Sequence, residues 1–113
     1  MNIGDYVRLN NCVYDVVVIN RIAEIYEDTI LTENDGSMYQ GEYAKEEIIK
    51  SSPNIIDLIE EGDYVNGMKV AVNCKENGGN IVIFTDMDCV NENNIKSIVT
   101  KEQFSQMEYK VGE

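Results

Sequence analysis

The chain has 113 residues, 43% of them hydrophobic, and it carries 21 acidic against 9 basic residues for a net charge of −12. This length fits one compact body or two very small units that share a core, and the hydrophobic content excludes a disordered chain. The charge argues against direct binding to nucleic acid, and it fits either solubility alone or a partner with a basic surface.

Residues 1–50 are predicted to form an N-terminal β unit. Alternation along Ile3-Gly4-Asp5-Tyr6-Val7-Arg8-Leu9 predicts an opening strand, and the β-branched residues 16–19 predict the centre of a long one. Asp35-Gly36 indicates a hairpin turn. In order, the predicted elements are a strand over 3–9, a turn at 10–11, a long strand over 13–25, a strand over 26–32, a turn over 33–37, and strands over 38–43 and 48–49.

Residues 51–113 are predicted to form a second, similar β unit. Gly62-Asp63-Tyr64-Val65 repeats Gly4-Asp5-Tyr6-Val7, so the stretch 51–67 is interpreted as a joint between two similar units. Ser52 as N-cap and Pro53 at the first helical position predict one helical turn over 55–59, with a short strand as the alternative.

The rest of the second unit is predicted from turn and capping patterns. Asn66-Gly67 is typical of a two-residue hairpin, and Thr100 and Gln103 have the spacing of a capping box that opens a helix over 101–107. The other predicted elements are a strand with Val70, Val72 and Cys74 on one face, a loop over 75–80, a strand over 80–85, a loop over 86–94, a strand over 95–99 and an edge strand over 109–111. We therefore expect a mainly β protein of two small SH3-like barrel or meander units packed together, with one or two short helices.

Two stretches carry a resemblance. Residues 51–67, with NIIDLIE and GDYVNG, and residues 97–111, with IVTKEQF and QMEYKV, resemble small uncharacterised proteins encoded by phages and prophages of Clostridium-like Gram-positive bacteria. The resemblance covers about half of the chain and implies a phage source, with no assigned reaction. No signal peptide or membrane-length apolar run is present, so the host bacterial cytoplasm is the expected location and no membrane partner is expected.

Few residues suggest catalysis. The chain has no histidine and no glycine-rich loop with lysine for phosphate, so we do not expect an enzyme. Paired carboxylates at Glu46-Glu47, Glu60-Glu61 and Asp86/Asp88 are interpreted as solvated surface. Cys12, Cys74 and Cys89 are candidate zinc ligands, although no C-x-x-C pair supports them, and unligated thiols are the alternative.

Three acidic segments, residues 22–44, 51–68 and 76–95, contain no lysine or arginine. If they gather in space, they form an acidic surface that can occupy a basic groove which normally holds nucleic acid. This charge and the phage source predict an anti-defence protein, most concretely an anti-CRISPR inhibitor that mimics nucleic acid and blocks DNA binding by a host effector nuclease. The alternative is a structural or adaptor module of a phage particle or its assembly pathway. In either case we expect a monomer or small homo-oligomer. The candidate partner-binding residues are Glu24, Glu27, Asp28, Glu33, Asp35, Asp57, Glu60, Glu61, Asp86, Asp88 and Glu92.

Overall fold

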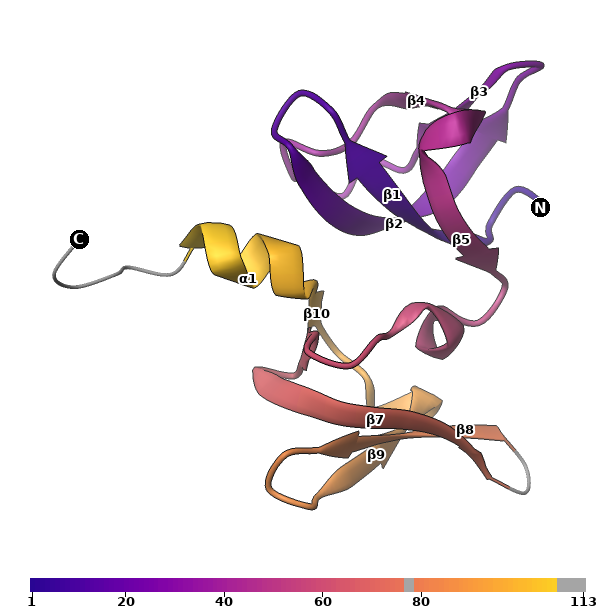
Figure 1. The fold of residues 1–113 in the computed structure, drawn as a ribbon. Helices are drawn as coiled ribbons and strands as arrows, with labels where there is room; N and C mark the ends of the chain where they lie inside the picture. The colour runs from indigo at the N-terminus through magenta and orange to yellow at the C-terminus, as the bar shows by residue number, and fades with distance from the viewer. Residues whose placement is uncertain (77–78, 108–113) are drawn as a thin grey trace, which may run out of the picture.

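The computed structural model describes residues 1–76 and 79–107. Figure 1 shows two β-sheets, one above the other, with a short helix beside their junction. Both sheets are five-stranded and antiparallel, and one of them curls into a half-barrel. The expectation of a mainly β protein with two small β units is therefore confirmed.

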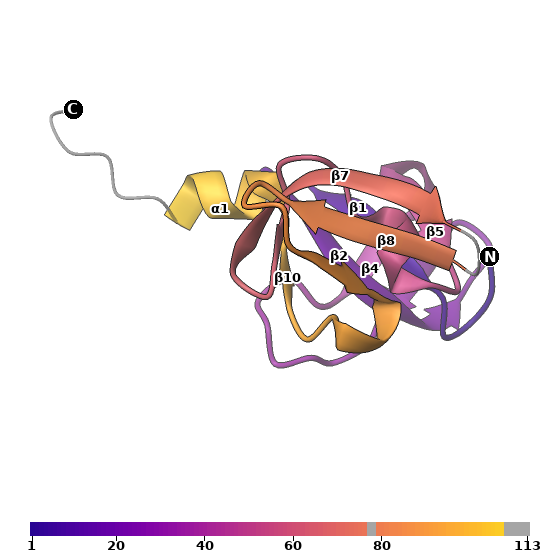
Figure 2. The ribbon, with the colours of Figure 1, turned by 90° about the horizontal axis from the view of Figure 1, so that it is seen from below.

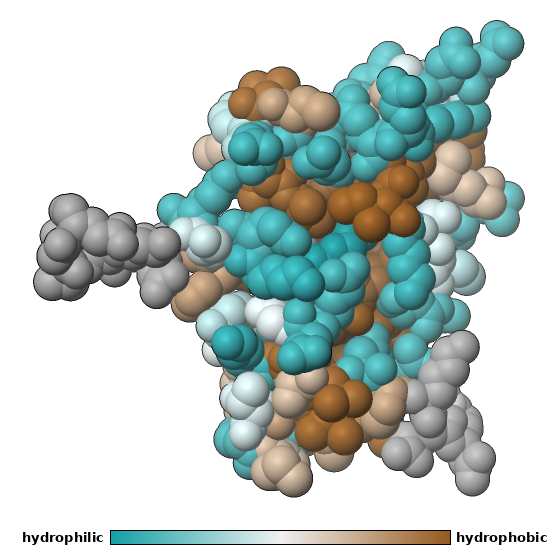
Figure 3. Space-filling view, in the orientation of Figure 1, coloured by the Kyte–Doolittle hydropathy of each residue, from teal (hydrophilic) through white to brown (hydrophobic). Residues whose placement is uncertain are grey.

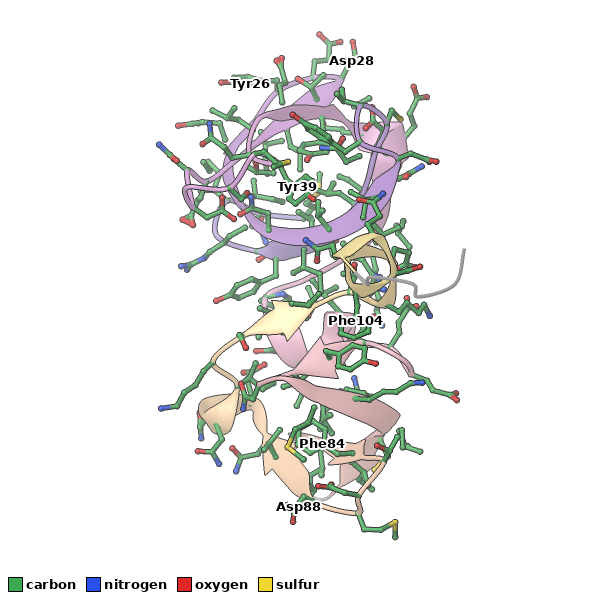
Figure 4. The ribbon with its side chains drawn as sticks, turned by 90° about the vertical axis from the view of Figure 1, so that its left-hand side faces the viewer. Tyr26, Asp28, Tyr39, Phe84, Asp88 and Phe104 are labelled. Atoms are coloured by element: carbon green, nitrogen blue, oxygen red, sulfur yellow. The ribbon has the colours of Figure 1, made fainter. Side chains whose placement is uncertain are left out.

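The N-terminal sheet has the strand order β4-β3-β2-β1-β5. Its elements are β1 (Tyr6–Asn11), β2 (Val16–Ile25), β3 (Thr29–Thr32), β4 (Glu42–Ala44), the 3-10 helix η1 (Lys45–Glu47) and β5 (Ile48–Ser52). The strong curvature of this sheet is visible in the upper part of Figure 4. It encloses one hydrophobic cluster, which consists of Val7, Leu9, Val16, Val18, Ile22, Ile30 and Tyr43.

The C-terminal sheet has the strand order β10-β6-β7-β8-β9. Its strands are β6 (Tyr64–Val65), β7 (Met68–Glu76), β8 (Gly79–Phe84), β9 (Cys89–Asn91) and β10 (Ile98–Val99). The 3-10 helices η2 (Ile55–Leu58) and η3 (Glu92–Asn94) and the helix α1 (Lys101–Met107) accompany it. A second cluster, separate from the first, consists of Ile56, Ile59, Val65, Val70, Val82 and Phe84. Viewed from below, this sheet lies over the N-terminal one, and α1 projects from one side (Figure 2).

Several predicted boundaries are wrong. Asn10-Asn11 is not a turn, because both residues still pair with β2 opposite Val17 and Val16, and the turn lies at 12–15. The division of the chain into two units between residues 50 and 51 stays a prediction, and β5 spans both of these positions. The predicted loop over 86–94 contains β9 and η3. The strand expected over 109–111 lies outside the described residues.

A β-bulge explains a wrong face assignment in β7. Val70, Val72 and Cys74 alternate in sequence, yet Val70 is buried and Val72 is half-exposed. The register of β7 against β8 shifts between Val70 and Val72, and the extra residue turns the following side chains to the other face.

The sequence repeat corresponds to one turn built twice. In the first copy, the N–H of Gly4 donates to the carbonyl of Ile22 (2.9 Å) and the N–H of Ile22 to the carbonyl of Asp5 (2.8 Å). The N–H of Asp5 donates to the carbonyl of Asn2 (3.1 Å). The Asp5 carboxylate accepts in return from the N–H of Asn2 (2.9 Å). Gly4 has a φ of +92°, which favours glycine.

The second copy reproduces these hydrogen bonds at the matching positions. Gly62 donates to Val70 (2.9 Å), Val70 to Asp63 (2.8 Å) and Asp63 to Glu60 (3.1 Å), all between backbone groups. The Asp63 carboxylate accepts from the N–H of Glu60 at 2.8 Å. Gly62 has a φ of +94°. The two sheets are thus opened by the same turn, and the surroundings of its aspartate differ.

Candidate functional site

The junction between the sheets is centred on a buried ion pair. Arg8 of β1 and Asp63 of the second turn are 1% and 0% exposed. Arg8 donates from Nη1 to Asp63 Oδ2 (2.6 Å) and from Nη2 to Asp63 Oδ1 (3.1 Å). This is the paired geometry by which a guanidinium binds a carboxylate most strongly. Arg8 therefore connects the N-terminal sheet to the start of the C-terminal one.

Further carboxylates surround the same guanidinium. Arg8 Nη2 donates to Glu102 Oε2 (3.3 Å), and Arg8 Nε lies 3.5 Å from Glu60 Oε2. Arg8 Nη1 also donates to the carbonyl of Leu58 at 3.0 Å. Lys101 Nζ donates to Glu60 Oε1 (3.0 Å), so a second cation balances the outer carboxylate. We call Arg8, Glu60, Asp63, Lys101 and Glu102 the Arg8 cluster.

The charges of the Arg8 cluster favour its ionised form. Burial acts to lower the pKa of Arg8, but the hydrogen bond and charge of Asp63, with Glu60 and Glu102, outweigh it and raise that pKa. The pKa of Lys101 is raised chiefly by its hydrogen bond to Glu60. Arg8 thus stays charged inside the protein, and its enclosure by the chain leaves it no surface for a ligand.

Helix α1 closes the junction from one side. Its capping box forms as predicted, because Thr100 N–H donates to Gln103 Oε1 (3.0 Å) and Gln103 N–H to Thr100 Oγ1 (3.1 Å). Thr100 Oγ1 also donates to the carbonyl of Val17 in β2 at 2.6 Å. Phe104 stacks on Tyr64 of β6 with ring centroids 3.9 Å apart. The helix therefore contacts both sheets.

The sequence reasoning missed the Arg8 cluster as a unit. It named Glu60 as a surface acid and a candidate partner-binding residue, and it gave no structural role to Arg8 or to the Asp63 carboxylate. Two signals pointed to the cluster: an arginine between Val7 and Leu9 of the opening strand, and an aspartate in each copy of the repeated turn.

The structure does not bring the eleven predicted acids together. Figure 4 shows Asp28 at one end of the molecule and Asp88 at the other. Asp57 accepts from Ser52 Oγ (2.6 Å) and Asn80 Nδ2 (3.0 Å), and Glu92 Oε2 accepts from the N–H of Ile56 (3.3 Å). Together with Glu60, these acids hold the junction and its neighbouring loops.

Three more of the eleven acids make local contacts. Asp35 accepts from the N–H of Ser37 (2.9 Å), Asp86 accepts from the N–H of Asp88 (3.1 Å), and Glu33 lies 4.0 Å from Arg21. Burial acts to raise the pKa of Asp35, but the hydrogen bonds from Ser37 outweigh it and lower that pKa. The remaining acids are exposed, and within the described residues their carboxylates form no hydrogen bond or ion pair: Glu24, Glu27, Asp28, Glu61 and Asp88.

The three cysteines do not form the zinc site that was considered. Cys12 lies in the turn after β1, Cys74 on β7 and Cys89 on β9, with β8 between the last two strands. Across residues 1–76 and 79–107, no group of three or more cysteine, aspartate or glutamate side chains could hold a metal ion. All three thiols are free.

A cleft with a volume of about 450 Å³ lies beside the junction. Tyr6 and Ile19 of the N-terminal sheet face Ile55 and Ile98 across it, and Glu92 and Lys96 supply its charges. Within the described part of the chain, no helix has the length and apolar character needed to cross a membrane.

Comparisons with known proteins found no match for this chain. No protein-family model matches this chain, and no curated protein or solved structure shows significant similarity to it.

Proposed function

We propose that this chain is an acidic, non-enzymatic protein that binds a basic, nucleic-acid-binding surface of another protein. In its most specific form, the proposal is that the chain is a phage-encoded inhibitor of a host CRISPR effector and blocks DNA binding by that effector. The supporting observation is a set of exposed carboxylates that form no hydrogen bond or ion pair with the described residues: Glu24, Glu27, Asp28, Glu61 and Asp88. Of these, Asp28 lies at one end of the molecule and Asp88 at the other (Figure 4).

The placement of the basic residues adds to this argument. Arg8 is buried in its cluster, Lys101 is paired with Glu60, and Lys45 Nζ donates to the carbonyl of Glu27 (2.9 Å). These cations are already engaged within the chain, so they offer little attraction to a phosphate backbone. A surface of this kind attracts a basic partner over a long range and loses that attraction as salt rises.

A competition assay tests the proposal. The protein is added to a CRISPR effector and labelled target DNA at low and at physiological salt, and the fraction of bound DNA is measured. We expect displacement that weakens with salt, and a weaker inhibitor when Glu24, Glu27 and Asp28 are changed to Gln, Gln and Asn. Failure to displace DNA from any basic nucleic-acid-binding protein at low salt would overturn the proposal.

A structural or adaptor module of a phage particle is the second candidate. The observation in its favour is the separation of Asp28 from Asp88, because a nucleic-acid mimic gains most from a continuous acidic stripe. Two sheets locked by the Arg8 cluster would suit a rigid spacer. Mass spectrometry of purified particles distinguishes the candidates, since an inhibitor of a cytoplasmic effector need not be packaged.

A further inference from the structure

One end of the N-terminal sheet carries exposed apolar side chains in a hollow. Val13 is 85% exposed, Met38 65% and Tyr14 45%. Together with Tyr39 they line a cavity of about 350 Å³ between the turn after β1 and the connection from β3 to β4. Figure 3 shows brown surface at the upper left, near the β1–β2 connection in Figure 1. We call these four residues the hairpin patch.

The hairpin patch is held in place by the residues beneath it. The rings of Tyr14 and Tyr39 meet edge to face with centroids 5.6 Å apart. Asn11 Oδ1 accepts from the N–H of Tyr14 (3.0 Å), and Asn11 Nδ2 donates to the hydroxyl of Tyr43 (2.8 Å). That hydroxyl in turn donates to the carbonyl of Tyr39. The two tyrosines of the patch, fixed in this way, lose little conformational freedom when a partner binds.

The surroundings of the hairpin patch are acidic. Glu42 and Glu47 line the same cavity, and no lysine or arginine is among its described lining residues. The charge of Glu47, with smaller effects of burial and Asp15, raises the pKa of the Cys12 thiol at the cavity wall. The apolar side chains of the hairpin patch therefore lie in a negative electrostatic potential.

We propose that the hairpin patch is a docking site for a basic protein segment. The segment places an aliphatic or aromatic side chain in the cavity and a neighbouring lysine or arginine against Glu42 and Glu47. A second copy of this chain fits less well, because each copy carries a net charge of −12 and like charges oppose association. The inference rests on the proposed function, since it names the site at which the basic partner binds.

An NMR titration tests the docking site on the intact protein. The probe is a twelve-residue synthetic peptide of Lys, Arg and Leu, and its control replaces every Leu by Ser. We expect the Leu peptide to shift the amide signals of residues 11–15, 38–43 and 47, and the Ser peptide to bind at least about tenfold more weakly.

Matched variants locate the site. Val13→Ser with Met38→Ser should weaken binding of the Leu peptide about tenfold, because both apolar contacts are lost. Met87→Ser changes a methionine that is even more exposed than Met38 (83% against 65%), on the connection between β8 and β9, and should leave affinity unchanged. Glu42→Gln with Glu47→Gln should weaken binding and reduce its salt dependence. Unchanged signals elsewhere show that the fold is kept.

Three results would overturn the docking site: equal binding of both peptides, signal shifts centred away from the hairpin patch, or a dimer that Val13→Ser with Met38→Ser turns into a monomer. If these occur while the protein still displaces DNA from an effector, only the docking site fails. If the Leu peptide binds as expected but no nucleic-acid-binding protein is inhibited, the proposed function fails and the docking site stands.

Discussion

Arg8 lies between Val7 and Leu9 in β1, and all three side chains are buried. Neighbours on a strand point to opposite faces, so β1 must be covered on both sides. Val7 and Leu9 enter the hydrophobic cluster of the N-terminal sheet, while Arg8 meets the joint that follows β5. An arginine at this position is therefore explained by the carboxylate of the repeated turn.

Loss of the Arg8 side-chain charge should destabilise the protein strongly. Arg8→Met leaves Asp63 buried without its cation, and we expect the free energy of unfolding to fall by about 3–5 kcal/mol. Urea denaturation followed by circular dichroism measures it. The matched control is Arg21→Met, at a side chain half-exposed beside Glu33, which should cost less than about 1 kcal/mol. Equal losses in the two variants would contradict a structural role for the Arg8 cluster.

The reactivity of Cys12 should report the charge of Glu47. Glu47 raises the pKa of this thiol, and only the thiolate reacts with iodoacetamide. Glu47→Gln lowers the pKa, so at fixed pH near neutrality the thiolate fraction rises and alkylation should accelerate about two- to fivefold. Mass spectrometry across pH 6.5 to 9 follows Cys12 and uses Cys89 as the internal reference. Glu46→Gln makes the same charge change and should have a smaller effect; equal acceleration by both would refute a specific contact.

At the level of elements, local patterns were predictable and packing-dependent ones were not. The capping box of Thr100 and Gln103 and the turn at Asn66-Gly67 depend on neighbouring residues alone, and both form as predicted. The predicted N-cap at Ser52 is wrong, because Ser52 ends β5 and η2 begins at Ile55 after an Asn54 that makes no side-chain cap. The Ser52 hydroxyl still accepts a hydrogen bond from the N–H of Asn54 at 3.1 Å, so Ser52 stabilises a turn and does not cap a helix.

The two glycines of the repeated turn should differ in their tolerance of a side chain. Both have strongly positive φ, so Gly4→Ala and Gly62→Ala should each cost about 1–2 kcal/mol of stability. At Gly62 the added Cβ would lie 3.3 Å from Lys101 Cδ, whereas at Gly4 the nearest atom is Arg21 Nη2 at 3.8 Å. Gly62→Ala should therefore be the more destabilising in thermal unfolding. The opposite order would mean that Lys101 is not seated against the second turn.

At the level of the whole molecule, the sequence could not predict which acids share a surface. Asp57, Glu60 and Glu92 differ from the exposed acids because their carboxylates are already engaged within the chain. They accept hydrogen bonds from Ser52, Lys101 and Ile56, respectively. These contacts depend on how two sheets meet, which no local spacing encodes. The joint itself was predicted from the repeat, but its ion pair joins residues 55 positions apart.

The same long-range pair should couple the unfolding of the two sheets. The hydrophobic clusters are separate, so cooperation depends on the Arg8 cluster and on α1, which Gln106 Nε2 ties to the carbonyl of Tyr14 at 3.0 Å. Hydrogen exchange of Arg8→Met should show faster exchange of amides in β7 and β8 as well as in β1 and β2, by a similar factor in both sheets. Arg21→Met should accelerate neither appreciably. If Arg8→Met accelerates exchange in β1 and β2 alone, the two sheets open independently and the buried pair does not couple their unfolding.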